Sequence, residues 1–336
     1  MRLPGLRIGA VVLLLTACAQ AGERCALVWT RGVNEHPEWC EAFQKAGFDS
    51  LTVKLPPTAR DTLWWTNPSS LDSTNALLAE AHRTNLRGYF QIPLGMMTGT
   101  KFGPRTMTAA GFTESLLACP LNEEFWEKYL IPTLSFVARK SLDHPALKGV
   151  ILDTEQYYGK ERSGAINEHY CFCDACFSEF FKSRGIREAL PTPAARQPWL
   201  ESNDLLAAYW QHLEDRTREH FQRLAKSIQE IAPDFEIHFY IFEDTWFYRG
   251  LLKGLSVTKH PVFVFDGKTY NGFLKGWSKE AKSALARLNH RAVWVPGFYT
   301  ATLNLRALRI NIRKALEDGG SYWVYNEEEP FPFAEF

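Results

Sequence analysis

Two carboxylates stand two residues apart at the end of the segment Gly149-Val150-Ile151-Leu152-Asp153-Thr154-Glu155. The apolar residues before them predict a buried strand, and side chains two positions apart on a strand share a face. Asp153 and Glu155 therefore project from the same side, where each negative charge favours protonation of the other carboxylate. Such a pair can keep a proton near neutral pH and act as a general acid. A salt-bridged or helix-capping pair is the alternative interpretation.

Further acidic and aromatic residues follow other apolar runs, and this combination is typical of a carbohydrate site. Asp266 is a candidate nucleophile or base, with an ion pair to Lys268 as the alternative. Glu327 is a candidate substrate-binding residue, although it begins an acidic run of the kind that is usually solvated. Aromatic residues make up 14% of the chain, so any single ring can equally belong to the core. The candidate stacking surfaces are Tyr157, Trp246, Tyr270, Tyr299 and Trp323.

Cysteines form a second group with chemical potential. Cys171, Cys173 and Cys176 lie within six residues, a spacing that allows three thiolates to converge on one tetrahedral metal ion. Disulfides between such close neighbours are strained, but six cysteines besides Cys18 make three disulfides the alternative. Cys25 and Cys40 are a candidate disulfide that would close a short loop after the first strand.

The elements that position these residues alternate between short apolar strands and longer amphipathic segments. Eight such units predict a single (β/α)8 barrel with an extended, Cys-rich insertion after the fourth strand, and functional residues at the carboxyl ends of the strands. A doubly wound sheet is the alternative, but no Gly-rich phosphate loop follows the first strand. The predicted strands are Cys25–Arg31, Phe48–Leu55, Leu86–Leu94, Leu147–Tyr157, Phe235–Phe242, His260–Phe265, Ala292–Tyr299 and Gly320–Tyr325. The predicted helices are His36–Ala46, Leu71–Thr84, Asn122–Arg139, Asp204–Ile231, Gly276–Leu288 and Leu303–Leu316.

The first residues predict export. A positive start precedes the short apolar run Ile8–Leu15, and Leu15-Thr16-Ala17-Cys18 resembles the bacterial lipobox. The resemblance implies cleavage before Cys18, lipidation of its sulfur and anchoring in a membrane, with the outer membrane expected. The predicted organisation is a signal peptide over residues 1–17, an anchor and linker over 18–24, and the barrel over 25–336. A plain secretory signal with a chance cysteine is the alternative.

Charge and composition limit the classes of binding partner that the sequence allows. The 336 residues carry 38 Lys+Arg against 38 Asp+Glu, which argues against electrostatic binding of nucleic acid. No segment after the leader is long and apolar enough to span a membrane, so the expected membrane contact is the lipid anchor alone. The expected partner is a carbohydrate, and the sequence leaves the oligomeric state open.

The segment Tyr170-Cys171-Phe172-Cys173-Asp174-Ala175-Cys176 resembles the metal-binding segment of family 42 β-galactosidases, which are barrel glycosidases. The resemblance implies a structural zinc ion held by Cys119, Cys171, Cys173 and Cys176, with His169 as a substitute fourth ligand. It also implies that Glu155 is the catalytic acid/base. Two departures are clear: Thr154 replaces the Asn that precedes that acid in the family, and Phe298-Tyr299 ends the seventh strand without the family's nucleophilic Glu.

The Asp153-Thr154-Glu155 segment also resembles the fourth-strand motif of family 18 chitinase-like enzymes. There the Glu is the acid, and the Asp orients an acetamido group of the substrate that acts as the nucleophile. Lys148 and Ile151 replace two earlier acids of that motif. The sequence thus predicts a lipid-anchored glycoside hydrolase, with Glu155 as acid/base and Asp153, Asp266 or the substrate itself completing the mechanism. The alternative is a catalytically silent carbohydrate-binding barrel.

Overall fold

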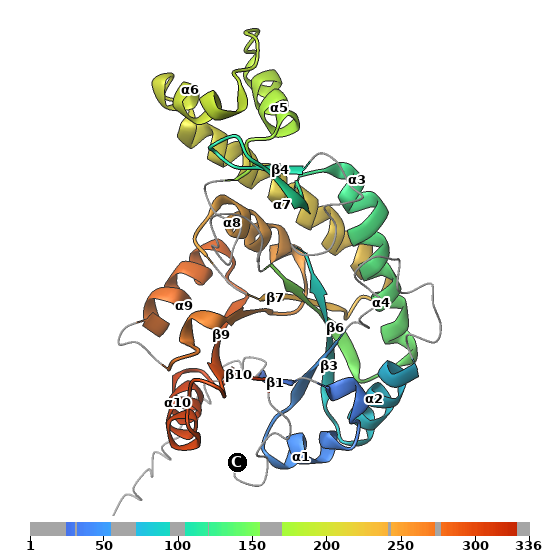
Figure 1. Ribbon diagram of the computed structural model, residues 1–336. Coiled ribbons are helices and arrows are strands. Elements are labelled where there is room, and N and C mark those ends of the chain that lie inside the picture. Colours follow the sequence, from blue (N-terminus) through green and yellow to red (C-terminus); the bar gives the residue numbers. More distant parts are fainter. Residues whose placement is uncertain are drawn as a thin grey trace, which may run out of the picture.

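The computed structural model describes residues 25–30, 32–54, 72–94, 105–119, 121–154, 170–240, 243–272 and 277–327. Eight parallel strands close into a barrel in the order β1-β10-β9-β8-β7-β6-β3-β2, with helices around the outside (Figure 1). This confirms the single (β/α)8 barrel, and each predicted strand is present. The strands are β1 (Ala26–Thr30), β2 (Ser50–Val53), β3 (Arg87–Pro93), β6 (Leu147–Asp153), β7 (Glu236–Tyr240), β8 (Val262–Asp266), β9 (Ala292–Tyr299) and β10 (Tyr322–Asn326).

The predicted helices are also present, and a further helix on the barrel, α8, was not predicted. The helices on the barrel are α1 (Trp39–Lys45), α2 (Asp72–Arg83), α4 (Ile131–Asp143), α7 (Leu206–Ile231), α8 (Trp246–Gly254), α9 (Trp277–Leu288) and α10 (Leu305–Asp318). Helix α4 continues from the short α3 (Glu123–Phe125) through a π-helical turn at Trp126–Leu130. The sequence analysis did not predict α8, in which Arg249 and Lys253 are the only two residues that are not buried. It packs closely on α7: a Cβ at Gly250 would lie 2.5 Å from the Glu214 carbonyl oxygen.

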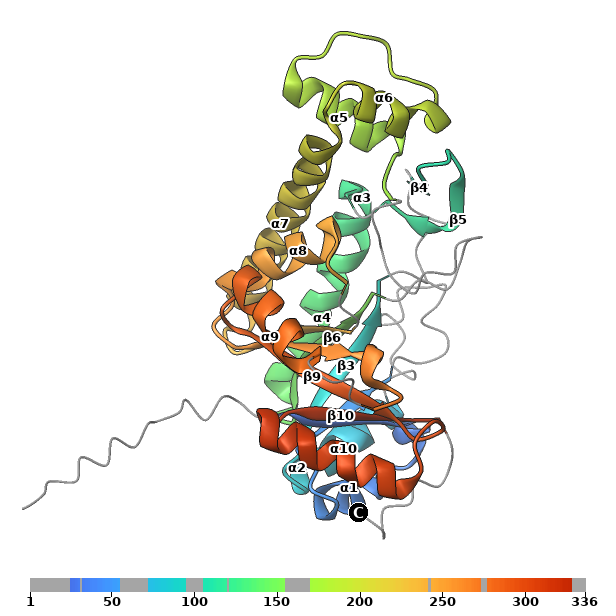
Figure 2. The ribbon, with the colours of Figure 1, turned by 90° about the vertical axis from the view of Figure 1, so that its left-hand side faces the viewer.

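A lobe projects from the barrel beside the amino-terminal end of α7. It contains α5 (Asp174–Arg184) and α6 (Arg196–Ser202), which stand away from the strands in both views (Figures 1 and 2). This is the insertion predicted after the fourth strand. A hairpin of β4 (Arg105–Met107) and β5 (Thr113–Ala118), inserted after β3, lies next to the lobe and was not predicted.

Alternation along the strands separates two apolar clusters. Side chains such as Leu27 on β1 and Phe265 on β8 point into the barrel, whereas Val28 and Val264 point outward against the helices. Strand β6 follows the same rule: Ile151 belongs to the interior cluster, and Leu152 to the outer one. The next interior position on β6 is Asp153.

The expected disulfide between Cys25 and Cys40 is wrong: both are buried free thiols in the structure. Cys25 precedes β1 on the interior face, where its Sγ lies 3.9 Å from Ser50 Oγ. Cys40 is on α1 and belongs to the outer cluster. The barrel wall separates the two sulfurs, because strand alternation directs Cys25 inward while α1 covers the outside.

Within the described ranges, none of the helices is both long and apolar enough to cross a membrane. Residues 1–24, which hold the predicted leader and Cys18, lie outside the described residues.

Candidate functional site

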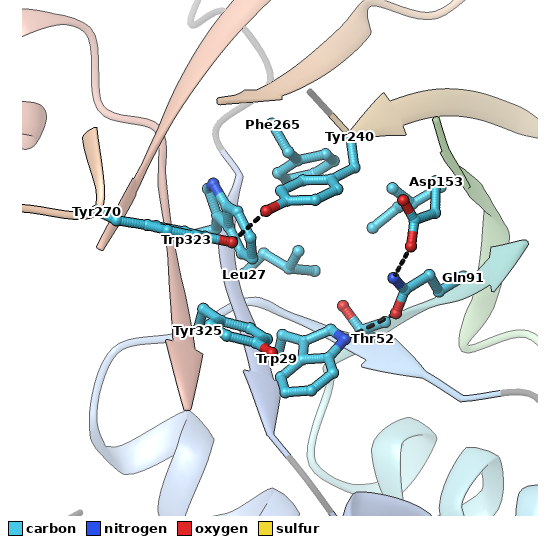
Figure 3. A pocket seen from close by; sticks show the side chains of 11 residues that line it. Leu27, Trp29, Thr52, Gln91, Asp153, Tyr240, Phe265, Tyr270, Trp323 and Tyr325 are labelled. Carbon is cyan, nitrogen blue, oxygen red and sulfur yellow. Dashed lines mark hydrogen bonds between the residues drawn. The ribbon is translucent and has the colours of Figure 1, made fainter. Parts of the chain in front are cut away.

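A cavity of about 230 Å³ opens among side chains that point inward near the carboxyl ends of the strands (Figure 3). Seven of the eight strands, β1, β2, β3, β6, β7, β8 and β10, contribute to it, together with the turn that follows β8. The lining residues are Leu27, Trp29, Thr52, Gln91, Ile151, Asp153, Tyr240, Phe265, Tyr270, Trp323 and Tyr325. This is the end of a (β/α)8 barrel at which active sites are built.

One wall of the cavity is aromatic. The rings of Tyr270 and Tyr325 are stacked, with centroids 5.6 Å apart and planes at 13°. Tyr240 meets Trp323 edge-on at 5.0 Å, and its hydroxyl is hydrogen-bonded to the hydroxyl of Tyr270. A Cβ at Gly297 would lie 2.3 Å from Trp323 Nε1, so glycine at this position of β9 makes room for the indole. Flat apolar faces of this kind suit the CH face of a sugar ring.

The opposite wall is polar. Gln91 Nε2 donates a 2.8 Å hydrogen bond to Asp153 Oδ2, and Trp29 Nε1 donates to Gln91 Oε1 at 2.7 Å. Thr52 is 2% exposed, and its hydroxyl has no partner among the described residues. The cavity therefore offers ring faces on one side and hydrogen-bonding groups on the other, as an amphipathic sugar requires.

The end of β6 is anchored beside the cavity. Thr154 Oγ1 donates to the Tyr240 carbonyl oxygen at 2.6 Å and accepts from Tyr248 Oη at 3.0 Å. These bonds tie β6 to β7 and α8, so Asp153 projects from a fixed backbone. The Asp153 residue is 5% exposed. Glu155 and Tyr157, and also His169, lie outside the described residues.

Two of the predicted stacking residues, Tyr270 and Trp323, line the cavity, but Trp246 does not. Trp246 is the first residue of α8, is fully buried, and donates from Nε1 to the Tyr170 carbonyl oxygen at 2.6 Å. The expectation that it forms a stacking surface is wrong, because α8 carries it under the lobe and away from the mouth.

Asp266 also departs from its predicted role. Phe263 and Phe265 of β8 point inward, so Asp266 has the opposite orientation. Its Oδ2 accepts from Trp294 Nε1 at 2.9 Å, and its Oδ1 accepts from the Lys268 backbone N–H at 2.8 Å. Burial raises the pKa of this carboxyl group above its ordinary value. Asp266 caps the turn after β8 and faces away from the cavity, which corrects both the catalytic assignment and the alternative ion pair.

Glu327 and Tyr299 lie at the mouth, outside the cavity lining. Tyr299 Oη donates to Glu327 Oε2 at 2.7 Å, and Tyr325 Oη donates to Glu327 Oε1. The Tyr299 ring is 4.9 Å from Tyr325 and 5.5 Å from Tyr270. The aromatic wall thus continues out of the cavity to a carboxylate.

Sequence reasoning missed several lining residues. Tyr325 could have been identified from the alternation of side chains along a strand, because it lies two positions after Trp323 on the same strand. Trp29 is related in the same way to Leu27 on β1. Gln91 and Tyr240 had no distinguishing signal, since each lies within an otherwise apolar or mixed strand sequence.

The four cysteines Cys119, Cys171, Cys173 and Cys176 converge in the lobe. All four are buried free thiols, and their sulfurs lie within 4.8 Å of one another. Cys119 Sγ is 3.3 Å from Cys176 Sγ and 3.7 Å from Cys173 Sγ. Four thiolates at about 2.3 Å from a zinc ion would place their sulfurs about 3.8 Å apart. The cluster therefore fits a tetrahedral metal ion of this type.

Surrounding groups hold the cysteine segment in place. Tyr209 Oη donates to the Cys171 carbonyl oxygen at 2.6 Å, and the Phe172 N–H donates to the Met107 carbonyl oxygen at 2.9 Å. Hydrogen bonds from the neighbouring thiols lower the pKa of Cys173, which favours a thiolate. The cluster joins the β4–β5 hairpin to α5, two insertions that come from different loops of the barrel.

No protein-family model matches the chain, and the comparison with curated proteins finds no match. Solved structures do match. A β-galactosidase from the psychrophilic Marinomonas ef1 superposes with a TM-score of 0.60 and 11% identity, over 91% of this chain and 55% of that protein. The cold-adapted β-galactosidase from Rahnella sp. R3 gives 0.59 and 13%, over 91% and 50%.

A shorter enzyme matches over most of its own length. The β-mannanase from the blue mussel Mytilus edulis has a TM-score of 0.50 and 13% identity, over 93% of this chain and 89% of that protein. The chain spans about half the length of the two β-galactosidases. At these identities the comparisons establish the fold alone: this chain is a (β/α)8 barrel.

Proposed function

We propose that the chain is a glycoside hydrolase and that the cavity at the barrel mouth binds the sugar at the scissile bond. The observation that carries the proposal is the buried Asp153 carboxylate, which lies in the wall of a cavity lined by aromatic rings. The location at the carboxyl ends of the strands supports it, as does the likeness of the fold to that of several glycosidases.

In this proposal Glu155 is the general acid/base and Asp153 assists it. Glu155 follows Asp153 by two positions, so an extended chain directs both side chains to the same face. Asp153 is held by Gln91 and stands beside the aromatic wall. A fixed negative charge there stabilises the positive charge that develops on the sugar ring in the transition state, or orients an acetamido group of the substrate.

The four-cysteine cluster is proposed to hold one structural zinc ion. Such an ion would cross-link the hairpin and α5, and with four protein ligands it has no open position for water. The surrounding residues support a structural role: Tyr209 and Trp246 hydrogen-bond the backbone that carries Cys171. The cysteines contribute to the site indirectly, by holding the lobe against α8.

Anchoring through a lipid on Cys18 remains a proposal from the sequence. Replacing Cys18 by Ser should release the protein from the membrane fraction, whereas the wild type should sediment with it. Membrane association that survives the substitution, with a mature amino terminus other than Cys18, would refute the anchor.

The test of the activity is a screen of the purified chain from Cys25 onward against aryl glycosides and polysaccharides. Release of aryl alcohol or reducing ends is the expected result, and Asp153→Asn should lower kcat on every substrate that the wild type cleaves. Thr52→Val is a matched change at the cavity wall that keeps the carboxylate, and it should act mainly on KM. If the Asp153→Asn variant hydrolyses its substrates at the wild-type rate, the active site does not lie in this cavity.

A catalytically silent carbohydrate-binding barrel is the second candidate. The observation that favours it is that Asp153 is the sole carboxylate in the cavity lining, within the described part of the chain. Saturable binding of a glycan by calorimetry, quenching of Trp29 fluorescence and no hydrolysis of the same glycan would establish this function instead.

A further inference from the structure

Glu327 is a carboxylate held by two phenol groups. Tyr299 donates to one oxygen and Tyr325 to the other, so both the position and the plane of the carboxylate are fixed. These tyrosines come from β9 and β10, and their rings lie 4.9 Å apart. Two hydrogen bonds to its oxygens favour the charged form of a carboxyl group.

The barrel places Glu327 across the mouth from Asp153. Strands β6 and β10 are separated by three strands on either side of the closed barrel, so they are diametrically opposed. Trp323 and Tyr325 of β10 line the cavity, and Glu327 occupies the next position of the same alternation. Its contact with the Tyr325 hydroxyl is consistent with this orientation.

Other acids near the carboxyl ends of β7 and β8 are engaged elsewhere. Glu243 pairs with Lys268 at 3.5 Å, and Asp244 pairs with Arg249 at 3.2 Å. Asp266 caps a turn on the outer side of β8. Glu327 accepts hydrogen bonds from the hydroxyl groups of Tyr299 and Tyr325, which orient its carboxylate at the mouth.

We propose that Glu327 is the catalytic nucleophile of this site. The inference rests on the proposed glycosidase function and adds the residue that attacks the sugar. Two carboxyl groups on opposite sides of the bond are what glycoside hydrolysis requires, and the described residues place Glu327 opposite Asp153 at the end of β6.

In the first step a Glu327 oxygen forms a bond to the anomeric carbon. The glycosidic C–O bond breaks, and its electron pair stays on the leaving oxygen, which takes a proton from the carboxylic acid at the end of β6. In the second step a water oxygen attacks the same carbon, and its proton passes to the β6 carboxylate. The ester bond breaks with its electron pair returning to Glu327, so the anomeric configuration is retained.

The phenol groups favour a nucleophile over a base. A carboxylate that accepts two hydrogen bonds is a weakened proton acceptor, which disfavours removal of a proton from water. The same bonds stabilise the anion that must leave the anomeric carbon in the second step. The aromatic wall that runs from Tyr240 through Tyr270 to Tyr325 leads from the cavity to this carboxylate.

The experiment uses a 2-deoxy-2-fluoroglycosyl fluoride that matches an aryl glycoside cleaved by the wild type. Time-dependent inactivation should add one fluorosugar per chain, and mass spectrometry of the digest should locate it on Glu327. Glu327→Ala should lower kcat by about 10⁴-fold or more. Azide should restore turnover of the aryl glycoside by that variant and give a glycosyl azide of the opposite anomeric configuration.

Tyr299→Phe and Tyr325→Phe each remove one donor, so each should lower kcat roughly ten- to a hundredfold with a smaller change in KM. Glu243→Gln is the control at another acid of the rim, and it should keep wild-type rates. Label on another residue, no label, inversion of configuration, or full activity of Glu327→Ala would each overturn the assignment while hydrolysis itself stands. A wild type that cleaves no glycoside would overturn the proposed function and this inference together.

Discussion

Gln91 holds Asp153 at the barrel mouth: Gln91 Nε2 donates to Asp153 Oδ2 at 2.8 Å. The other end of the same amide accepts from Trp29 Nε1 at 2.7 Å. Since an indole N–H can only donate, the amide oxygen of Gln91 must face Trp29 and its NH₂ group must face the carboxylate. A chain of two hydrogen bonds therefore connects β1 through β3 to β6 and fixes the orientation of the Asp153 side chain.

Changing Gln91 should affect catalysis through Asp153. Gln91→Glu keeps an acceptor for Trp29 but replaces the donor to Asp153 with a second carboxyl group. Near neutral pH we expect kcat to fall roughly ten- to a hundredfold, the size expected for losing a hydrogen bond to a charged group. Activity should recover in part at lower pH, where the introduced carboxyl group is protonated and donates again. A pH–rate profile parallel to that of the wild type would contradict the positioning role.

The general acid can be tested with two substrate types. Glu155→Gln keeps the shape of the side chain but cannot donate a proton, so kcat on a natural glycan should fall by roughly 10²–10⁴-fold. Nitrophenyl glycosides should be affected less, because their leaving group needs little protonation. Steady-state kinetics on both substrates measures this difference. If kcat falls equally on both substrates, Glu155 has a role other than that of the general acid. If kcat on the glycan is unchanged, Glu155 takes no part in the mechanism.

If the cysteine cluster holds zinc, loss of one cysteine should lower both the zinc content and the thermal stability of the protein. Protein purified without a tag should contain about one zinc per chain, and Cys173→Ser should lose most of it. Thermal unfolding of that variant should begin at a lower temperature, because the hairpin and α5 are no longer cross-linked. Cys40→Ala is the matched control: it also removes a buried thiol but should leave the zinc content unchanged. A metal-free wild type without free thiols would instead indicate disulfides.

Asp266 should matter for stability and its pH dependence. Burial raises its pKa in the folded chain above the value of about 3.9 in an unfolded chain. The folded state therefore holds its proton more tightly, and the contribution of Asp266 to stability declines as the pH rises through this range. Asp266→Asn removes that decline, so its melting temperature relative to the wild type should increase from pH 4 upward.

Kinetic measurements on the same Asp266 variant test whether this residue takes part in catalysis. Asp266→Asn should keep wild-type kcat on every cleaved substrate, because the side chain points to Trp294 and away from the cavity. A large loss of kcat without a loss of stability would show that Asp266 belongs to the catalytic site.

Sequence alone was sufficient for the architecture. Eight apolar segments separated by amphipathic ones predicted the barrel, because a strand needs only a few β-forming residues and a helix only a periodic apolar stripe. The spacing of Cys171, Cys173 and Cys176 predicted a local cluster, since thiols so close in sequence can meet without help from the rest of the fold. The approach of Cys119 was implied by the family resemblance, and the structure confirms it.

Tertiary structure decided which side chains reach the cavity. Strands of this barrel are buried on both faces, so a run such as Val262-Phe263-Val264-Phe265 contains no signal for which face is inside. This is why Asp266 was assigned to the wrong side. Trp246 was not recognised as core because the helix that it begins, α8, was not predicted. The pairing of Gln91 with Asp153, and of Glu327 with Tyr299, joins residues from different strands. Closure of the barrel brings them together, because hydrogen bonding between neighbouring strands sets the register that no single segment contains.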